Sequence, residues 1–205
     1  MNENDILKGR LKDLANAAFR QNRYTYTNFL SAADMEVFYS NLEQLSFAGY
    51  TIFGGRESCD RVMIAFGNEA DCGYAPAFPI CTMKVSAVSD KFSDDLNHRD
   101  FLGALMNLGI EREMVGDILI TESTHSGKHN NAYIFCVDTV ADYIAENLTK
   151  IRHTNVKCTF CSTQDTDEIQ IKKEPLHIIA ASARADAVTA TITGLSRSST
   201  SLLFR

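Results

Sequence analysis

The sequence of 205 residues lacks any apolar run near the roughly eighteen residues that a membrane span requires, so we expect no membrane partner. Basic residues are also scarce: 20 lysines and arginines stand against 26 aspartates and glutamates, for a formal net charge of -6. This balance excludes a chain that coats nucleic acid over its whole surface, and any such contact must be local. Residues 1–10 are polar and lack the apolar segment of a secretory signal. We therefore expect a cytoplasmic protein.

The sequence also lacks the motifs of common catalytic sites. No nucleophile-and-base pair, glycine-rich cofactor loop or cluster of metal ligands is visible. His98-Arg99-Asp100 is similar to the catalytic loop of kinases, but position 105 is Leu where that loop needs Asn. We predict that the chain is not an enzyme, with no catalytic residues, no cofactor and no small-molecule substrate.

Six cysteines are present, and in the cytoplasm we expect them to be mostly reduced. Cys158 and Cys161 have the spacing of a zinc or redox pair. However, residues three apart in a strand point to opposite faces, and no second pair of this kind follows. We therefore interpret one as a core residue and the other as a surface residue, and we predict no metal site.

Hydrophobic residues make up 45% of the chain, as in a globular protein. The first 76 residues have the pattern of a small α/β unit. Asp5 is predicted to cap a first helix that ends near residue 21, and Ser31 begins a second helix. Two strands closed by glycines follow at 50–53 and 62–66, and a loop is predicted at 68–77. The residues predicted on the buried side of the second helix are Met35, Phe38, Tyr39, Leu42 and Leu45.

From Pro79 onward the order of signals is strand, helix, strand, strand, helix, strand. This βαββαβ order is the ferredoxin-like order that RNA-recognition folds also use, and it predicts an α+β protein. It fixes architecture and leaves function open, because many unrelated proteins share it. The predicted elements are 80–88, 99–108, 117–121, 132–137, 139–149 and 156–162.

Two aromatic residues alternate along the third predicted strand. Tyr133 and Phe135 flank Ile134 and therefore share one face of the sheet. In RNA-recognition folds such rings stack on bases, but the basic and glycine positions that usually precede them are absent here. We predict that the two rings pack against the two helices, and solvent-exposed rings would instead favour RNA.

The last residues resemble the start of an S4 RNA-binding domain. Arg184-Ala185-Asp186 matches the first helix of such domains, and Leu195-Ser196-Arg197-Ser198 matches the second. Helix N-termini with serine hydroxyls and arginine side chains bind phosphate, so Arg184, Ser196, Arg197 and Ser198 are candidate RNA contacts. The alternative is that Ser196 only caps a helix and Arg197 is a solvated charge. We expect an S4 domain that is truncated at residue 205.

Three further residues are candidate contacts to RNA phosphate. His98 and Arg99 stand at a predicted helix N-terminus, where they either touch phosphate or only orient the preceding loop. Lys128 lies in the segment 125–129, which is predicted to be a solvated hairpin tip, with RNA contact through Lys128 as the alternative. The predicted divisions of the chain are 1–76, 77–163, a linker or hairpin at 164–181, and the partial S4 domain at 182–205.

Several of these segments together resemble one bacterial family, the YlmH-like proteins. The resemblance is carried by the segments 28–31, 53–55, 61–62, 98–110, 116–120 and 143–148, together with the S4-like tail. It implies a cytoplasmic RNA-binding protein of the translation apparatus without enzymatic activity. It further implies association with the ribosome, through large-subunit ribosomal RNA and tRNA, in ribosome-associated quality control.

Two alternatives from other classes stay open. The first is an accessory to RNA modification, since S4 domains also precede pseudouridine synthases, although there the S4 domain comes first. The second is a protein-interaction module whose acidic surface binds a protein partner.

Overall fold

The computed structural model describes residues 2–121, 129–162, 177–196 and 199–200. The contacts divide the chain into two compact units, 1–169 and 170–205. This division lies close to one predicted boundary, and the boundaries at 76, 163 and 181 stay predictions.

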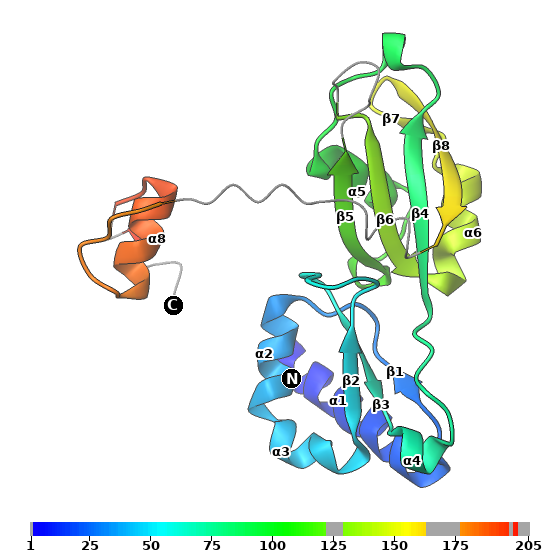
Figure 1. Cartoon of the computed structure of the whole chain (residues 1–205), viewed down its shortest axis with the longest axis vertical. Helices are drawn as coiled ribbons and strands as arrows, with labels where there is room; N and C mark the ends of the chain where they lie inside the picture. Colours follow the sequence, from blue (N-terminus) through cyan, green and yellow to red (C-terminus); the bar gives the residue numbers. More distant parts are fainter. Residues whose placement is uncertain (1, 122–128, 163–176, 197–198, 201–205) are drawn as a thin grey trace. The chain divides into compact units, whose positions relative to one another are not determined.

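The N-terminal part of the first unit packs helices on one side of a three-stranded antiparallel sheet (Figure 1). Leu11, Phe38 and Phe66 are fully buried between the two layers. Predicted strands at 50–53 and 62–66 are confirmed as β2 and β3, while the two-residue β1 and the helix α4 were not predicted. Its elements are α1 (Glu3–Gln21), β1 (Thr25–Tyr26), α2 (Ala32–Ser40), α3 (Leu42–Leu45), the 3-10 turn η1 (Ser46–Ala48), β2 (Tyr50–Phe53), β3 (Met63–Phe66) and α4 (Glu69–Cys72).

Two local predictions in this part are wrong. Asn2, not Asp5, caps α1: the Asn2 side chain accepts the Asp5 amide at 2.8 Å, and the Asp5 carboxylate accepts the Asn2 amide in return. Both residue types suit an N-cap, and the partner three residues later decides between them. Tyr39 is 55% exposed rather than buried, because α2 ends at Ser40 and the chain restarts as α3. The cap at Ser31 is confirmed.

The central part forms a five-stranded antiparallel sheet with the order β5-β6-β4-β8-β7. Without the two-residue β7, this is the strand order of a ferredoxin-like fold, so the α+β prediction is confirmed. The helices α5 and α6 cover one face of the sheet (Figure 1). The elements are β4 (Ile80–Ala87), η2 (Asp90–Phe92), α5 (His98–Asn107), η3 (Arg112–Met114), β5 (Val115–Thr121), β6 (Asn131–Val137), α6 (Asp138–Asn147), β7 (Lys150–Ile151) and β8 (Thr154–Cys161).

The core of this part lies between the sheet and its two helices. Phe101 and Leu105 of α5 and Ile144 of α6 are fully buried against Met83 and Ile134 of the sheet. Burial of each such side chain contributes about 1.5–3 kcal/mol to folding relative to leaving it in water. The sheet is therefore held from one side by apolar packing.

The second unit contains the helix α8 (Ala185–Thr193), which ends at Gly194 in the left-handed conformation. The first of the two short helices predicted in the tail is thereby confirmed. The second helix is predicted between Gly194 and Arg205, and residues 197–198 and 201–205 of this segment lie outside the described residues. In the described part of the chain, no helix combines the length and apolar character needed to cross a bilayer.

Candidate nucleic-acid interface

Alternate residues of β6 face opposite sides of the central sheet. Ala132, Ile134 and Cys136 belong to the core beneath the helices, which places Tyr133 and Phe135 on the other face. The prediction that the two rings pack against the helices is therefore wrong. Alternation showed that they share a face, but the helices pack on the face that holds the aliphatic residues.

The N-terminal part of the chain covers one portion of this second face. Phe135 is fully buried in a cluster with Phe29 and Met63 of that part. Gly55 approaches the Phe135 ring so closely that an added Cβ would lie 2.4 Å from the ring atom Cδ1. Phe135 is thus unavailable for stacking on a base.

Hydrogen bonds around Arg61 connect the N-terminal part to the central sheet. Arg61 donates from Nε to the Val115 carbonyl at 3.0 Å and from Nη2 to the Phe29 carbonyl at 2.9 Å. The Asp117 carboxylate accepts the Asp60 and Arg61 amides at 2.8 and 3.1 Å. Burial lowers the pKa of the Arg61 guanidinium, and the carboxylates of Asp34, Asp117 and Glu113 oppose this effect.

The rest of the second face presents lysines. Lys84 and Tyr133 are half-buried, and the Lys84 ammonium lies 5.5 Å from the centre of the Tyr133 ring. Lys157 and Lys150 are exposed, and the residues beside them in sequence, Val156 and Ile151, point into the helix-side core. The neighbouring positions on this part of the face are Ser86, Asn131, Asn155 and Thr159, so its described strand residues include no carboxylate.

These lysines were not among the contact residues predicted from the sequence. The signal was present, because Lys84 alternates with Met83 and Val85, and Lys157 alternates with Val156 and Cys158. What the sequence did not reveal is which face of the sheet the N-terminal part covers.

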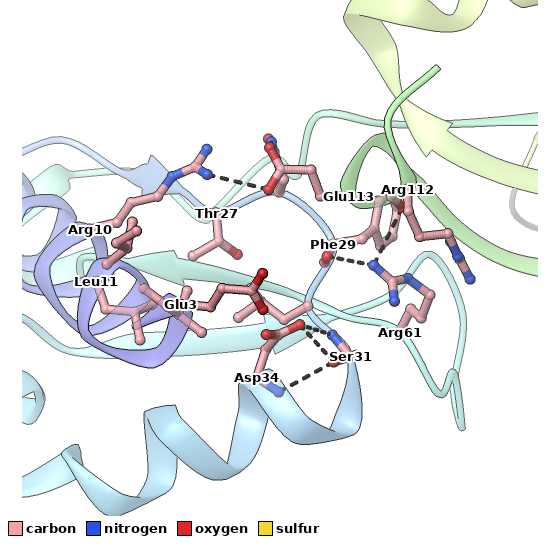
Figure 2. Close-up of a pocket in the computed structure, with 14 residues that line it drawn as sticks. Glu3, Arg10, Leu11, Thr27, Phe29, Ser31, Asp34, Arg61, Arg112 and Glu113 are labelled. Carbon is pink, nitrogen blue, oxygen red and sulfur yellow. Dashed lines mark hydrogen bonds and ion pairs between the residues drawn. The ribbon is translucent and has the colours of Figure 1, made fainter. Parts of the chain in front are cut away.

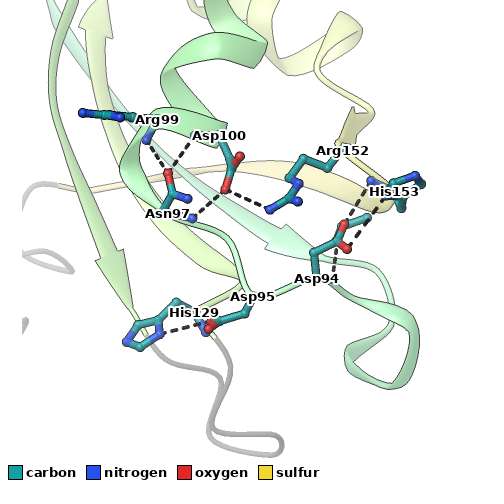
Figure 3. A network of polar contacts seen from close by, with 9 residues as sticks. Asp94, Asp95, Asn97, Arg99, Asp100, His129, Arg152 and His153 are labelled. Atoms are coloured by element: carbon teal, nitrogen blue, oxygen red, sulfur yellow. Dashed lines mark hydrogen bonds and ion pairs between the residues drawn. The ribbon is translucent and has the colours of Figure 1, made fainter.

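The predicted contacts His98 and Arg99 lie at the first turn of α5, as expected, and both are exposed. Figure 3 shows Arg99 beside the capping residue Asn97. Asn97 caps this helix by accepting the Arg99 amide at 2.9 Å and the Asp100 amide at 3.3 Å. Asp100 accepts the Asn97 amide at 2.9 Å and lies 3.7 Å from Arg152 Nη1. Side chains of the protein therefore already occupy two amides of this helix end.

Further carboxylates tie together the loops around this end of the sheet (Figure 3). Asp94 accepts the His153 amide and the Thr154 hydroxyl, each at 3.0 Å. The His153 amide contributes most to lowering the pKa of Asp94. Asp95 accepts the His129 amide at 2.8 Å and lies 3.2 Å from His129 Nδ1. This end mixes both charge signs, and Lys128 lies outside the described residues.

In the tail, Arg184 immediately precedes the first turn of α8. Its Nε donates to the Asp186 carboxylate at 3.0 Å, and this hydrogen bond raises the pKa of Arg184. The Ser196 hydroxyl accepts the Ser199 amide at 3.1 Å, as a helix cap does. Arg197 and Ser198 lie outside the described residues, so the predicted phosphate site is described only in part.

A pocket of about 560 Å³ lies between α1, the start of α2 and the segment that includes η3 (Figure 2). Its charged lining is balanced between three carboxylates and three guanidiniums. Glu113 accepts a hydrogen bond from the Asn28 side-chain nitrogen at 2.7 Å and lies 3.4 Å from Arg10 Nη1, while the Asp34 carboxylate accepts the amide of the α2 N-cap, Ser31, at 2.8 Å. Glu113, Arg10 and Asp34 are therefore engaged in contacts within the fold.

Among the described residues, no group of three or more His, Cys, Asp or Glu side chains comes together as a metal site would require. Cys158 faces the helix-side core and Cys161 the opposite face, as predicted from their spacing. Burial raises the pKa of the Cys136 thiol to about 12 and that of the Cys158 thiol to about 11. Both thiols are therefore poor nucleophiles at neutral pH.

Fold and surface together define a class of protein: a ferredoxin-like sheet that carries lysines on its helix-free face, with an N-terminal α/β part packed over a portion of that face. A family model described as "Putative RNA-binding domain in YlmH" matches residues 76–165. The chain is similar to ribosome-associated protein quality control protein P2 of Bacillus subtilis, with 27% identity over 185 residues. The matched stretch covers 90% of this chain and 68% of the relative.

A solved structure, described as cell division protein ylmH from Streptococcus pneumoniae, has the same fold. Its TM-score is 0.60 at 17% identity, over 83% of this chain and 96% of that one. These comparisons agree with the resemblance seen in the sequence: residues 76–165 match the domain of YlmH, and the chain is similar to the Bacillus subtilis relative over most of its length.

Proposed function

We propose that this chain is a cytoplasmic, non-catalytic RNA-binding protein that acts in ribosome-associated quality control. The description of the matched domain and the name of the Bacillus subtilis relative support this function. The observation that carries it in the structure is the lysine-bearing part of the sheet face, in a chain whose net charge is -6. Such a surface binds phosphates locally while the rest of the molecule repels them.

Finer parts of the proposal concern the partners and the remaining contact residues. The RNA is large-subunit ribosomal RNA together with tRNA. His98, Arg99 and Lys128 add further phosphate contacts, and Arg184, Ser196, Arg197 and Ser198 form a second phosphate site as part of an S4 domain.

Sedimentation with purified ribosomal subunits tests the proposal. The full chain is expected to pellet with large subunits and to be released as salt rises, because phosphate contacts displace counterions. Lys84→Glu/Lys157→Glu is expected to reduce the bound fraction several-fold. Lys8→Glu/Lys12→Glu on α1 makes the same change in net charge and is expected to bind as the parent does. Co-sedimentation with a protein partner but with neither subunit would contradict the proposal and favour an interaction module.

The tail is tested separately by Arg184→Ala/Arg197→Ala in the full chain. If the tail is a second phosphate site, this variant loses affinity and its binding depends less steeply on salt. Unchanged binding would restrict the RNA contact to the central sheet.

A further inference from the structure

The strand register places the three lysines of the sheet face on one line. Lys84 on β4 is directly opposite Thr159 on β8, and Lys157 lies two residues earlier on β8, opposite Ser86. Lys150 on β7 is opposite Asn155, which is again two residues earlier on β8. Each lysine is therefore one strand across and two residues along from the previous one.

This arrangement fixes the spacing of the positive charges. Two residues advance about 6.7 Å along a strand, and neighbouring strands lie about 4.8 Å apart, so each step between lysine Cα atoms is about 8 Å. The line runs diagonally over β4, β8 and β7, and its first member is in contact with the Tyr133 ring on β6. Successive phosphates of an extended strand lie within reach of flexible lysine side chains at this spacing.

The covered portion of the face limits what can bind there. Phe135 is paired with Thr82, two residues along β6 from the Tyr133–Lys84 pair, and it is fully buried by the N-terminal part. Tyr133 is the aromatic ring of β6 that remains accessible, and a single accessible ring stacks on one unpaired base. Lysines contact phosphates without reading bases, so the line carries little sequence information.

We infer that the lysine line Lys84, Lys157 and Lys150 is a track for the backbone of a single-stranded RNA segment, which enters beside Tyr133 and crosses the sheet diagonally. The inference rests on the proposed function and adds the form of the RNA, its path and its lack of sequence preference. Duplex RNA, whose bases are paired, has no base to offer to Tyr133 and binds more weakly.

The test measures the affinity of the full chain for labelled 12-nucleotide oligouridine and for an RNA hairpin duplex at several salt concentrations. For single strands, each lost phosphate contact reduces the slope of log K against log salt by about 0.7. Lys84→Ala, Lys150→Ala and Lys157→Ala are each expected to produce this reduction, and the triple variant a reduction of about 2. Lys8→Ala/Lys12→Ala removes two lysines of α1, away from the sheet face, and is the control that is expected to keep the parent slope.

Tyr133 is tested by a different readout. Tyr133→Leu is expected to weaken oligouridine binding about tenfold while leaving the salt slope unchanged, and Tyr133→Phe to bind as the parent does. Circular dichroism and melting temperature confirm that each variant is folded. RNA binding with an unchanged slope in the triple variant, or a preference for the duplex, would overturn the track but not the proposed function. A parent chain that binds neither these RNAs nor ribosomal subunits would overturn both.

Discussion

At the residue scale, the effect of adding one methyl group differs between two glycines of this fold. Gly55 has a φ of +105° and touches the Phe135 ring, whereas Gly103 lies in α5 with no heavy atom within 4 Å of an added Cβ. A methyl group at position 55 meets both backbone strain and a buried ring. The same methyl group at position 103 only removes the flexibility that glycine gives the unfolded chain.

We therefore expect opposite effects from the same substitution. Gly55→Ala is expected to lower the free energy of unfolding by about 3 kcal/mol through strain and overpacking. Gly103→Ala is expected to raise it by up to about 1 kcal/mol. Urea denaturation of both variants beside the parent measures the two effects. A neutral Gly55→Ala would mean that the N-terminal part does not press on Phe135 in solution.

At the scale of elements, the loops at one end of the central sheet depend on Asp94. Its carboxylate accepts bonds from the β7–β8 turn, in which Arg152 has a φ of +52°. The pKa of Asp94 is lowered from its ordinary value of 3.8, with His153 and Arg152 nearby. A carboxylate with a lowered pKa in the folded state stabilises that state above the unfolded-state pKa, and this contribution disappears as the pH falls through the folded-state pKa.

The prediction concerns the difference in melting temperature between the parent and Asp94→Asn. This difference is expected to be largest near neutral pH, where the carboxylate is ionised, and to shrink as the pH falls below about 4. Thermal denaturation between about pH 3 and 7 measures it, with Asp13→Asn on the exposed surface of α1 as the control. A difference that stays constant with pH would show that the ionised form of Asp94 is not what holds the turn.

Local patterns in the sequence predicted the positions of most helices and strands. They did not predict which elements pair or pack with one another. The helix predicted to begin at Arg99 begins at His98, and β6 begins one residue before the predicted Ala132. By contrast, β1 and β7 have two residues each, too few for an alternating pattern, and they exist because β3 and β8 pair with them. Tyr133 and Phe135 illustrate the same limit: alternation put them on one face, but contacts across the chain decided that one is buried and the other accessible.

For the candidate site, the same reasoning explains which residues were found. His98 and Arg99 were identified because a helix start has a local signature, and their contact with RNA stays a prediction. Lys84, Lys150 and Lys157 lie on three different strands, and only the register brings them into one line. A pattern spread over 74 residues of sequence, from 84 to 157, is invisible to local analysis.

At the scale of the whole molecule, Arg61 connects the N-terminal part to the central sheet. The Arg61 guanidinium donates to the carbonyl oxygen of Phe29 in the N-terminal part and to that of Val115 in the central sheet. The planar geometry of arginine allows both bonds at once, whereas the lysine ammonium offers a single point of charge.

Arg61→Ala is therefore expected to cost about 2 kcal/mol of unfolding free energy, and Arg61→Lys to recover little of this loss. Calorimetry is expected to show one transition for residues 1–169 in the parent and a broadened or split transition in Arg61→Ala. Arg20→Ala, at an exposed position in the last turn of α1, is the control. A sharp single transition in Arg61→Ala would indicate that apolar contacts alone couple the two parts.

The burial of Phe135 beneath Phe29 and Met63 also bears on how the protein can be dissected. A recombinant fragment cut at residue 76, where the family match begins, would lack Phe29 and Met63 and would expose apolar surface around Phe135 to water. Such a fragment is expected to aggregate through this exposed apolar surface. Weak RNA binding by the fragment would then reflect aggregation and would not measure the affinity of its lysines for phosphate.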